Sequence, residues 1–156
     1  MSKIKNVTDL LVTELTDILN AERQGQQSLP NITKRVTSSQ LRVTLERHHA
    51  ETDAQLRRLQ MIFSELNIAP EVDRLSGAPW EFISQEIPRG EALDNAVIDS
   101  MRRVEHHEMN AYTSARALAR LLGYRRIAEL LAKTFDEEWN TDRSLALLAQ
   151  PQLALA

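Results

Sequence analysis

The 156-residue chain is short enough for one domain, and its 42% content of hydrophobic residues is enough for one continuous core, so we predict a single domain over residues 1–156. A net charge of −3, with basic residues spread along the chain, argues against nucleic acid and anionic membranes as partners. The lack of cysteine excludes disulfides and thiolate-bound metals, so any metal needs oxygen or imidazole ligands. The first residues lack the apolar run of a secretion signal, which leads us to expect a cytoplasmic protein.

An aromatic content of 4%, only 4 glycines and abundant Ala, Leu, Glu, Arg and Gln predict an all-α protein. The predicted helices span residues 6–29, 38–66, 91–122 and 124–149. Asn6 is a good N-cap for the first helix, and Pro30 is expected to end it. Thr37 and Gln40 have the spacing of a capping box at the start of the second. Gly123 separates the third helix from the fourth, which ends before Pro151.

The connections predict the topology. Short links join the first helix to the second and the third to the fourth, so each pair is expected to be antiparallel. Residues 67–90 form a much longer connection, which can return along the bundle and contains a predicted short helix near Trp80–Ile83. One long crossover is typical of ferritin-like four-helix bundles, and we predict that fold.

Each predicted helix has an apolar stripe at helical spacing, and each stripe is interrupted by polar residues near its middle. The interruptions include Glu22 in the first helix, His48 and Gln55 in the second, Glu108 in the third and Glu138 in the fourth. Glu51 lies three residues after His48, Glu105 three before Glu108, and Asp142 one turn after Glu138.

These interruptions have two interpretations. A single Glu at the edge of an apolar stripe usually reaches water, and if all of these acids do so the chain is a metal-free interaction module. Four coincident interruptions instead indicate a buried acidic layer, whose repulsion and lost hydration require cations. Lys and Arg are scarce on the stripes, whereas two divalent metals would neutralise about four carboxylates.

The same residues resemble the YciE/YciF family of ferritin-like proteins. The resemblance covers nearly the full length and rests on Ala21-Glu22-Arg23-Gln24, His48 with Glu51, Thr52 and Gln55, Glu105-His106-His107-Glu108 with Tyr112, Leu122-Gly123-Tyr124, and Glu137-Glu138. It implies a bundle with a non-haem dimetal centre, a link to bacterial stress responses and a homodimer. It does not imply a particular reaction.

The resemblance also implies ligands. Carboxylates that bind metal in ferritin-like and rubrerythrin-like proteins correspond to Glu22, Glu51, Glu105, Glu108 and Glu138. The usual Glu-x-x-His is missing, because Ala54 follows Glu51 at that spacing and Thr141 follows Glu138. His48 is either the imidazole ligand or a neighbour of the ligands, and Asp142 either replaces the second histidine or does not. An oxygen-rich site of this kind suits two iron or manganese ions.

The leading functional hypothesis is a redox-active dimetal protein that oxidises Fe(II) or consumes peroxide or O2. The alternative is a non-enzymatic stress-induced bundle whose metals are structural or sequestered. Tyr112 is either a hydrogen-bond partner of a ligand or a core tyrosine. We expect Glu137 to point outward and His49, His106 and His107 to lie on the surface.

Overall fold

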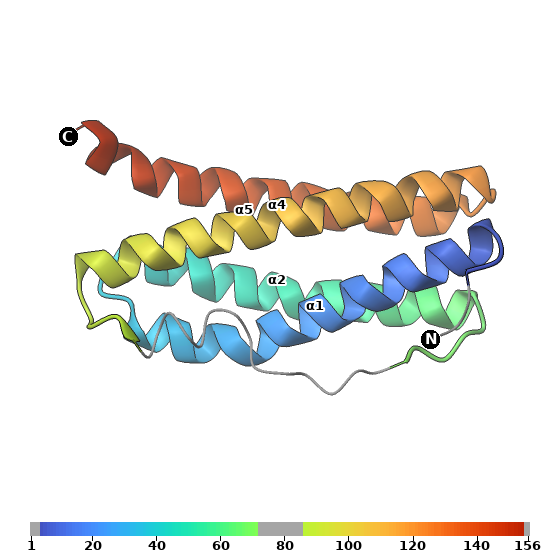
Figure 1. Ribbon diagram of the computed structural model, residues 1–156, viewed down its shortest axis with the longest axis horizontal. Helices are drawn as coiled ribbons and strands as arrows, with labels where there is room; N and C mark the ends of the chain where they lie inside the picture. The colour runs from blue at the N-terminus through green and yellow to red at the C-terminus, as the bar shows by residue number, and fades with distance from the viewer. Residues whose placement is uncertain (1–3, 72–85, 155–156) are drawn as a thin grey trace.

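The computed structural model describes residues 4–71 and 86–154, with side chains up to residue 149. Within this part of the chain there are four long helices and no strand, which confirms the predicted all-α class. The helices are α1 (Val7–Arg35), α2 (Ser39–Glu65), α4 (Glu91–Leu121) and α5 (Arg125–Ala154) (Figure 1).

The helices form a four-helix bundle made of two hairpins. α1 packs against α2 and α4, and α5 packs against α4 and α2, so α2 and α4 lie on a diagonal of the bundle. Figure 1 shows that α2 and α4 run in the same direction, so α2 ends at one end of the bundle and α4 begins at the other. This confirms the predicted long crossover between the two hairpins. The short helix predicted near Trp80–Ile83 lies outside the described residues.

The interior has three layers along the bundle axis. One apolar cluster contains residues of the first half of α1 and the second half of α2, including Leu15 and Leu59. The other contains residues from the opposite ends of these helices, including Leu29 and Leu45. Between the two clusters every helix contributes buried polar side chains, in the order along the chain that the interrupted stripes predict. The polar layer is therefore held between two apolar layers that stabilise the bundle.

Two helix ends differ from the prediction at prolines. α1 continues through Pro30 to Arg35, where the sequence predicted an end at Leu29. Ile32 and Val36 beyond the proline are 1% and 0% exposed, and burying these side chains offsets the loss of one helical hydrogen bond. α5 likewise continues past residue 149 and through Pro151 to Ala154.

The start of α2 also differs in detail. Ser38, and not Thr37, is the N-cap, with its hydroxyl accepting from the backbone N–H of Leu41 at 3.2 Å. The Thr37 hydroxyl instead donates to Asp94 Oδ2 at 2.7 Å. The buried Asp94 carboxylate also accepts the backbone N–H groups of both residues, so it fixes the α1–α2 turn against the start of α4. At the other predicted ends, Asn6 caps α1 and Gly123 has φ 82 between α4 and α5.

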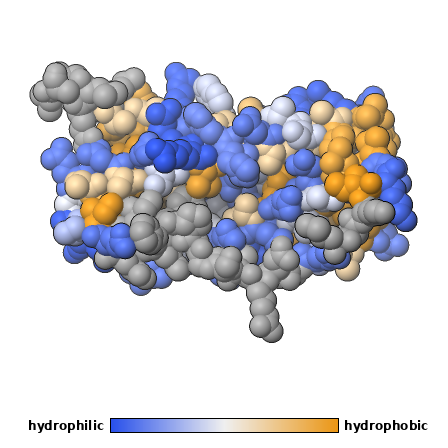
Figure 2. Space-filling view, viewed as in Figure 1, coloured by the Kyte–Doolittle hydropathy of each residue, from blue (hydrophilic) through white to orange (hydrophobic). Residues whose placement is uncertain are grey.

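No helix in the described part of the chain combines the length and the hydrophobicity that a membrane crossing requires. Hydrophilic residues cover much of the face shown in Figure 2, and hydrophobic ones gather at the end that carries the start of α1 and the α4–α5 turn. Leu121, at 72%, is the most exposed large hydrophobic residue among those described.

Candidate metal centre

The polar layer brings together side chains from all four helices. His48, Glu105 and Glu138 form one group and Glu22, Glu108 and Glu138 form another, each with one ligand atom per residue within 4.8 Å of the others. Glu138 belongs to both groups. Five of the seven predicted residues therefore form two adjacent triads that share one carboxylate, which is the arrangement expected of ligands around two neighbouring cations.

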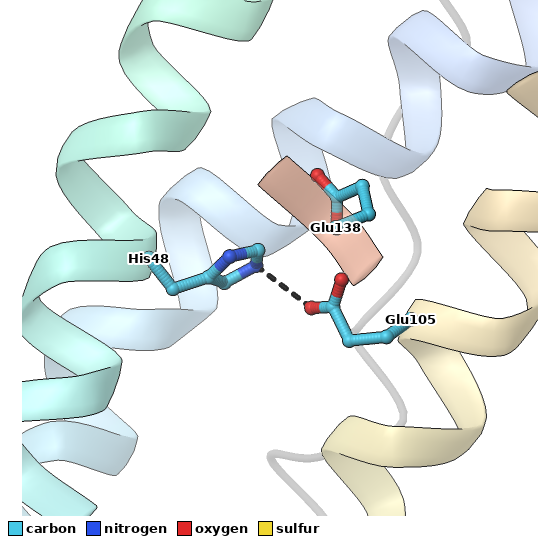
Figure 3. A group of neighbouring side chains, drawn as sticks. All are labelled: His48, Glu105 and Glu138. Atoms are coloured by element: carbon cyan, nitrogen blue, oxygen red, sulfur yellow. Dashed lines mark ion pairs between the residues drawn. The ribbon is translucent and has the colours of Figure 1, made fainter. Parts of the chain in front are cut away.

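The first triad joins α2, α4 and α5 across the centre of the bundle. Figure 3 shows the three side chains pointing toward one another, with the ion pair between His48 and Glu105 dashed. His48 Nε2 lies 3.0 Å from Glu105 Oε1. His48 is 4% exposed, and Glu105 and Glu138 are both 0% exposed, so bulk water does not compete for these atoms.

The second triad joins α1, α4 and α5. Glu22 and Glu108 are 2% and 5% exposed. Tyr112, one turn after Glu108 on α4, donates its hydroxyl hydrogen bond to Glu22 Oε1 at 2.7 Å. Of the two roles open to Tyr112, the structure therefore supports a partner of a candidate ligand, because it fixes one oxygen of Glu22.

Burial makes these carboxylates expensive to ionise. It raises the pKa of Glu22 from 4.5 to about 7, although the hydrogen bond from Tyr112 opposes the shift. Burial, together with repulsion from neighbouring carboxylates, raises the pKa values of Glu105, Glu108 and Glu138 well above 4.5. Burial also lowers the pKa of His48 below 6.5, which favours the neutral imidazole that binds metals.

The unpaired atoms of this layer test whether cations fit it. Both carboxylate oxygens of Glu138, as well as Glu105 Oε2 and Glu108 Oε2, are buried without a hydrogen-bond donor in the described structure. Buried acceptors are nearly always satisfied, so these oxygens lack a partner that a protein interior normally supplies. Four carboxylates and one neutral imidazole match two divalent cations in charge and in ligand type. The residues present therefore fit a dinuclear metal centre.

Contacts of the second ring nitrogen, Nδ1, orient the His48 side chain. Nδ1 lies 3.3 Å from Thr141 Oγ1 and 4.0 Å from Glu51 Oε2, and the Thr141 hydroxyl donates to Glu51 at 3.3 Å. Nε2 consequently faces the carboxylates. The side chain of Glu51 is 26% exposed and belongs to neither triad. Of the two residues in His-x-x-Glu, His48 lies in the cluster, whereas Glu51 lies on the Nδ1 side of the His48 ring, away from the carboxylates.

Asp142 lies outside both triads and is engaged elsewhere. Its Oδ1 accepts from Arg102 Nε at 3.0 Å, and its Oδ2 lies 3.0 Å from His106 Nε2. Both partners are on α4, so Asp142 links α4 to α5 beside the candidate centre. Whether Asp142 replaces a histidine ligand stays a prediction, and in this structure its two oxygens contact Arg102 and His106.

Sequence reasoning missed a basic group next to the centre. Arg58 of α2 donates to Glu137 Oε2 at 2.9 Å and to Thr134 Oγ1 at 3.1 Å, with its side chain only 12% exposed. Glu137, predicted to point outward, instead faces α2, where it also accepts from Gln55 at 3.3 Å. The sequence feature that could have indicated this contact is the position of Arg58, three residues after Gln55 and at the edge of the stripe.

The remaining histidines behave differently from one another. His106 and His107 are exposed, as predicted. His49 was predicted to lie on the surface but is half-buried, with Nε2 3.1 Å from the backbone oxygen of Gln26. Pro30 has no N–H to donate to that oxygen, so His49 supplies the donor that the proline removes from α1.

The fold and the centre define the class as a four-helix bundle with one long crossover and a core lined by carboxylates and histidine. The chain belongs to the family described as "Domain of unknown function (DUF892)", whose model matches residues 6–155.

Two relatives agree with this assignment. Protein YciF of Escherichia coli is 30% identical over 154 residues, which cover 94% of this chain and 92% of YciF. The crystal structure of the E. coli stress protein YciF has a TM-score of 0.83 at 26% identity, covering 97% of this chain and 99% of that one. A protein called YcfI from Rhodopseudomonas palustris has a TM-score of 0.82 at 28% identity, covering 92% of this chain and 95% of that one. The YciE/YciF resemblance is thus confirmed.

Proposed function

We propose that this chain is a stress-protection protein that holds two divalent ions, iron or manganese, and uses them to oxidise Fe(II) or to consume peroxide or O2. The observation that carries the proposal is that Glu138 belongs both to the triad with His48 and to the triad with Glu22, and that its two buried oxygens have no hydrogen-bond partner among the described residues. The description of YciF as a stress protein supports the physiological part.

The two ions, when bound, would supply electron transfer and an electrophilic surface for an oxygen species. The chain supplies the ligands and their surroundings. Glu105 and Glu108 project from one face of α4 at a spacing of three residues, so one helix contributes a carboxylate to each triad. Glu138 contributes to both triads, and burial of the whole layer keeps bulk water from competing with a small oxidant.

Neighbouring side chains keep two of these ligands in a fixed position. A proton on His48 Nδ1, directed toward Thr141 and Glu51, leaves the Nε2 lone pair free on the side of Glu105. The hydroxyl of Tyr112 restrains one oxygen of Glu22 and leaves the other available. Both contacts pre-organise donor atoms, which lowers the entropic cost of binding a cation.

Metal analysis of protein purified without chelators tests the proposal. We expect about two ions per chain, and fewer in Glu138→Gln, because that substitution removes the charge shared by both triads. Loaded Fe(II) should be oxidised much faster by the wild type than by Glu108→Gln, with equal helix content in both. A protein that takes up neither Fe(II) nor Mn(II) would refute the proposal.

A structural role for the metals is the alternative, and it has its own support. YcfI, whose fold this chain shares, is described as a candidate structural protein, and the triads cross-link all four helices. In that case metal would raise the melting temperature, while the wild type and Glu108→Gln would oxidise Fe(II) no faster than buffer does. Homodimer formation and a cytoplasmic location remain predictions from the sequence, and light scattering of the purified protein would test the first.

A further inference from the structure

A second candidate site lies away from the metal layer, where α4 meets α5 (Figure 1). A pocket of about 720 Å³ opens beside Gly123, with Ala128 and Ala132 of α5 among its lining residues. These alanines are one turn apart, so they lie on the same face of α5 and leave space where larger side chains would fill it. The volume is within the usual range of about 300–1,000 Å³ for small-molecule sites.

The charged residues that line the pocket are mainly basic. Arg116 and Arg120 of α4 and Arg125 at the start of α5 are among its lining residues, and Glu129 is the only acid among them. The excess is therefore two positive charges. Arg116 and Arg120 are one turn apart on α4, and like charges at this spacing repel each other unless an anion lies between them.

These three arginines also lack the carboxylate partners that several other arginines of the protein have. Arg58 and Arg102 pair with carboxylates, and Arg126 lies 2.9 Å from Glu65. Within the described residues, no carboxylate is within ion-pair distance of Arg116, Arg120 or Arg125. Arg116 Nε is moreover buried with no hydrogen-bond acceptor among the described residues. Because buried donors are normally satisfied, the acceptor for this group is expected to come from a ligand.

The start of α5 adds to the same field. Its first turn contains no acidic residue, in contrast to the first turn of α4, which contains Glu91 and Asp94. The N-terminus of a helix carries a partial positive charge and free N–H groups, both of which favour an anion. The field of the helix and the three guanidinium groups therefore have the same sign at one end of the bundle.

We propose that this pocket binds a phosphate group, held by Arg116, Arg120 and Arg125. The guanidinium group presents paired N–H donors that match the oxygens of phosphate, and a phosphate dianion would neutralise the excess charge. The pocket has room for more than the phosphate itself, so we assign a small phosphate monoester as the ligand class. The site is independent of the proposed metal chemistry.

Calorimetric titration of the full-length protein with AMP, inorganic phosphate and succinate tests the assignment. We expect both phosphates to bind at low ionic strength and succinate to bind more weakly. AMP binding more tightly than inorganic phosphate would support the monoester, and equal affinity would support free phosphate as the source. Succinate binding as tightly as phosphate, or no heat with either phosphate at up to about 10 mM, would overturn the proposal.

Site-directed variants test whether phosphate binds in this pocket. Arg116→Gln with Arg120→Gln should weaken phosphate binding by about tenfold or more, because each charge-assisted hydrogen bond is replaced by a weaker one. The matched control, Arg47→Gln with Arg103→Gln, removes the same charge elsewhere and should change the affinity less than about twofold.

A third variant removes space without changing charge. Ala132→Leu should weaken AMP more than inorganic phosphate, because only the larger ligand needs the room beside α5. If phosphate were bound by metal in the core, the arginine substitutions would not change its affinity. That result, or an equal loss of affinity in the control variant, would refute the proposed phosphate site.

Discussion

The contact between His49 and α1 predicts an unusual dependence on Pro30. In a regular helix the N–H of residue 30 would donate to the oxygen of Gln26, but proline has no N–H. His49 Nε2 lies 3.1 Å from this oxygen and supplies the missing donor from α2. Replacing His49 by Leu should therefore destabilise the protein, because the partly buried oxygen loses its cross-helix partner.

The size of the effect follows from the hydrogen bond. One intramolecular hydrogen bond contributes about 1 kcal/mol net, and leaving a buried acceptor unsatisfied raises the cost toward about 2 kcal/mol. For a protein of this size, each kcal/mol lowers the melting temperature by about 2–4 °C. His49→Leu should accordingly lower it by about 2–8 °C.

Pro30→Ala turns this estimate into a stricter test. The alanine introduced by this substitution has an N–H that can donate to Gln26, so His49→Leu should cost much less in the Pro30→Ala protein than in the wild type. Urea unfolding of the four proteins in this double-mutant cycle gives a coupling free energy, which we expect to exceed about 0.5 kcal/mol. Because both members of each comparison share residue 30, its effect on the unfolded chain cancels.

One result of the double-mutant cycle would contradict this explanation. If His49→Leu costs the same free energy in the wild type and in the Pro30→Ala protein, the histidine does not replace the donor that proline lacks. His107→Leu serves as the control, because His107 is exposed and should change stability little in either background.

Two further predictions concern the polar layer. In metal-free protein the pKa of Glu22 is about 7 instead of 4.5, so the folded state binds more protons than the unfolded state between these pH values and stability falls as pH rises through that window. Ionised Glu22 alone should lower the free energy of unfolding by on the order of 3 kcal/mol at neutral pH. In EDTA the melting temperature should therefore be lower at about pH 7.5 than at about pH 5, and adding Mn(II) should restore it. Equal melting temperatures in all of these conditions would mean that the acids are solvated. Arg58→Met should lower the free energy of unfolding by about 1–3 kcal/mol, since it removes the cation that pairs with Glu137 and leaves only the hydrogen bond from Gln55. Adding Glu137→Gln should restore part of the loss, and strictly additive losses in urea unfolding would contradict the pairing.

Most of the polar layer could be predicted from the sequence because helical periodicity is a local property. Residues spaced by three and four share one face, so the interior positions of Glu22, Glu108 and Glu138 follow once the helices are recognised. Glu105 follows from its spacing to Glu108. The crossover follows from connection lengths, since only a long segment can join two parallel helices.

The choice among residues at the edge of each stripe depended on how the helices are rotated and offset against one another. His48 reaches the carboxylates while Glu51 stays behind the ring, although both lie on one side of α2. Asp142 pairs with Arg102, and Glu137 turns inward to Arg58. Spacing within one helix gives only the side of that helix on which a residue lies, so it does not decide which residue at the edge of a stripe reaches the centre.

The path of α1 through Pro30 also required the assembled bundle. A proline removes one hydrogen bond wherever it occurs, and the sequence alone gives no reason for the helix to continue. The continuation is stabilised by the burial of Ile32 and Val36 and by a donor from His49 on another helix. Both contributions arise between segments far apart in the chain, so local propensity does not contain them.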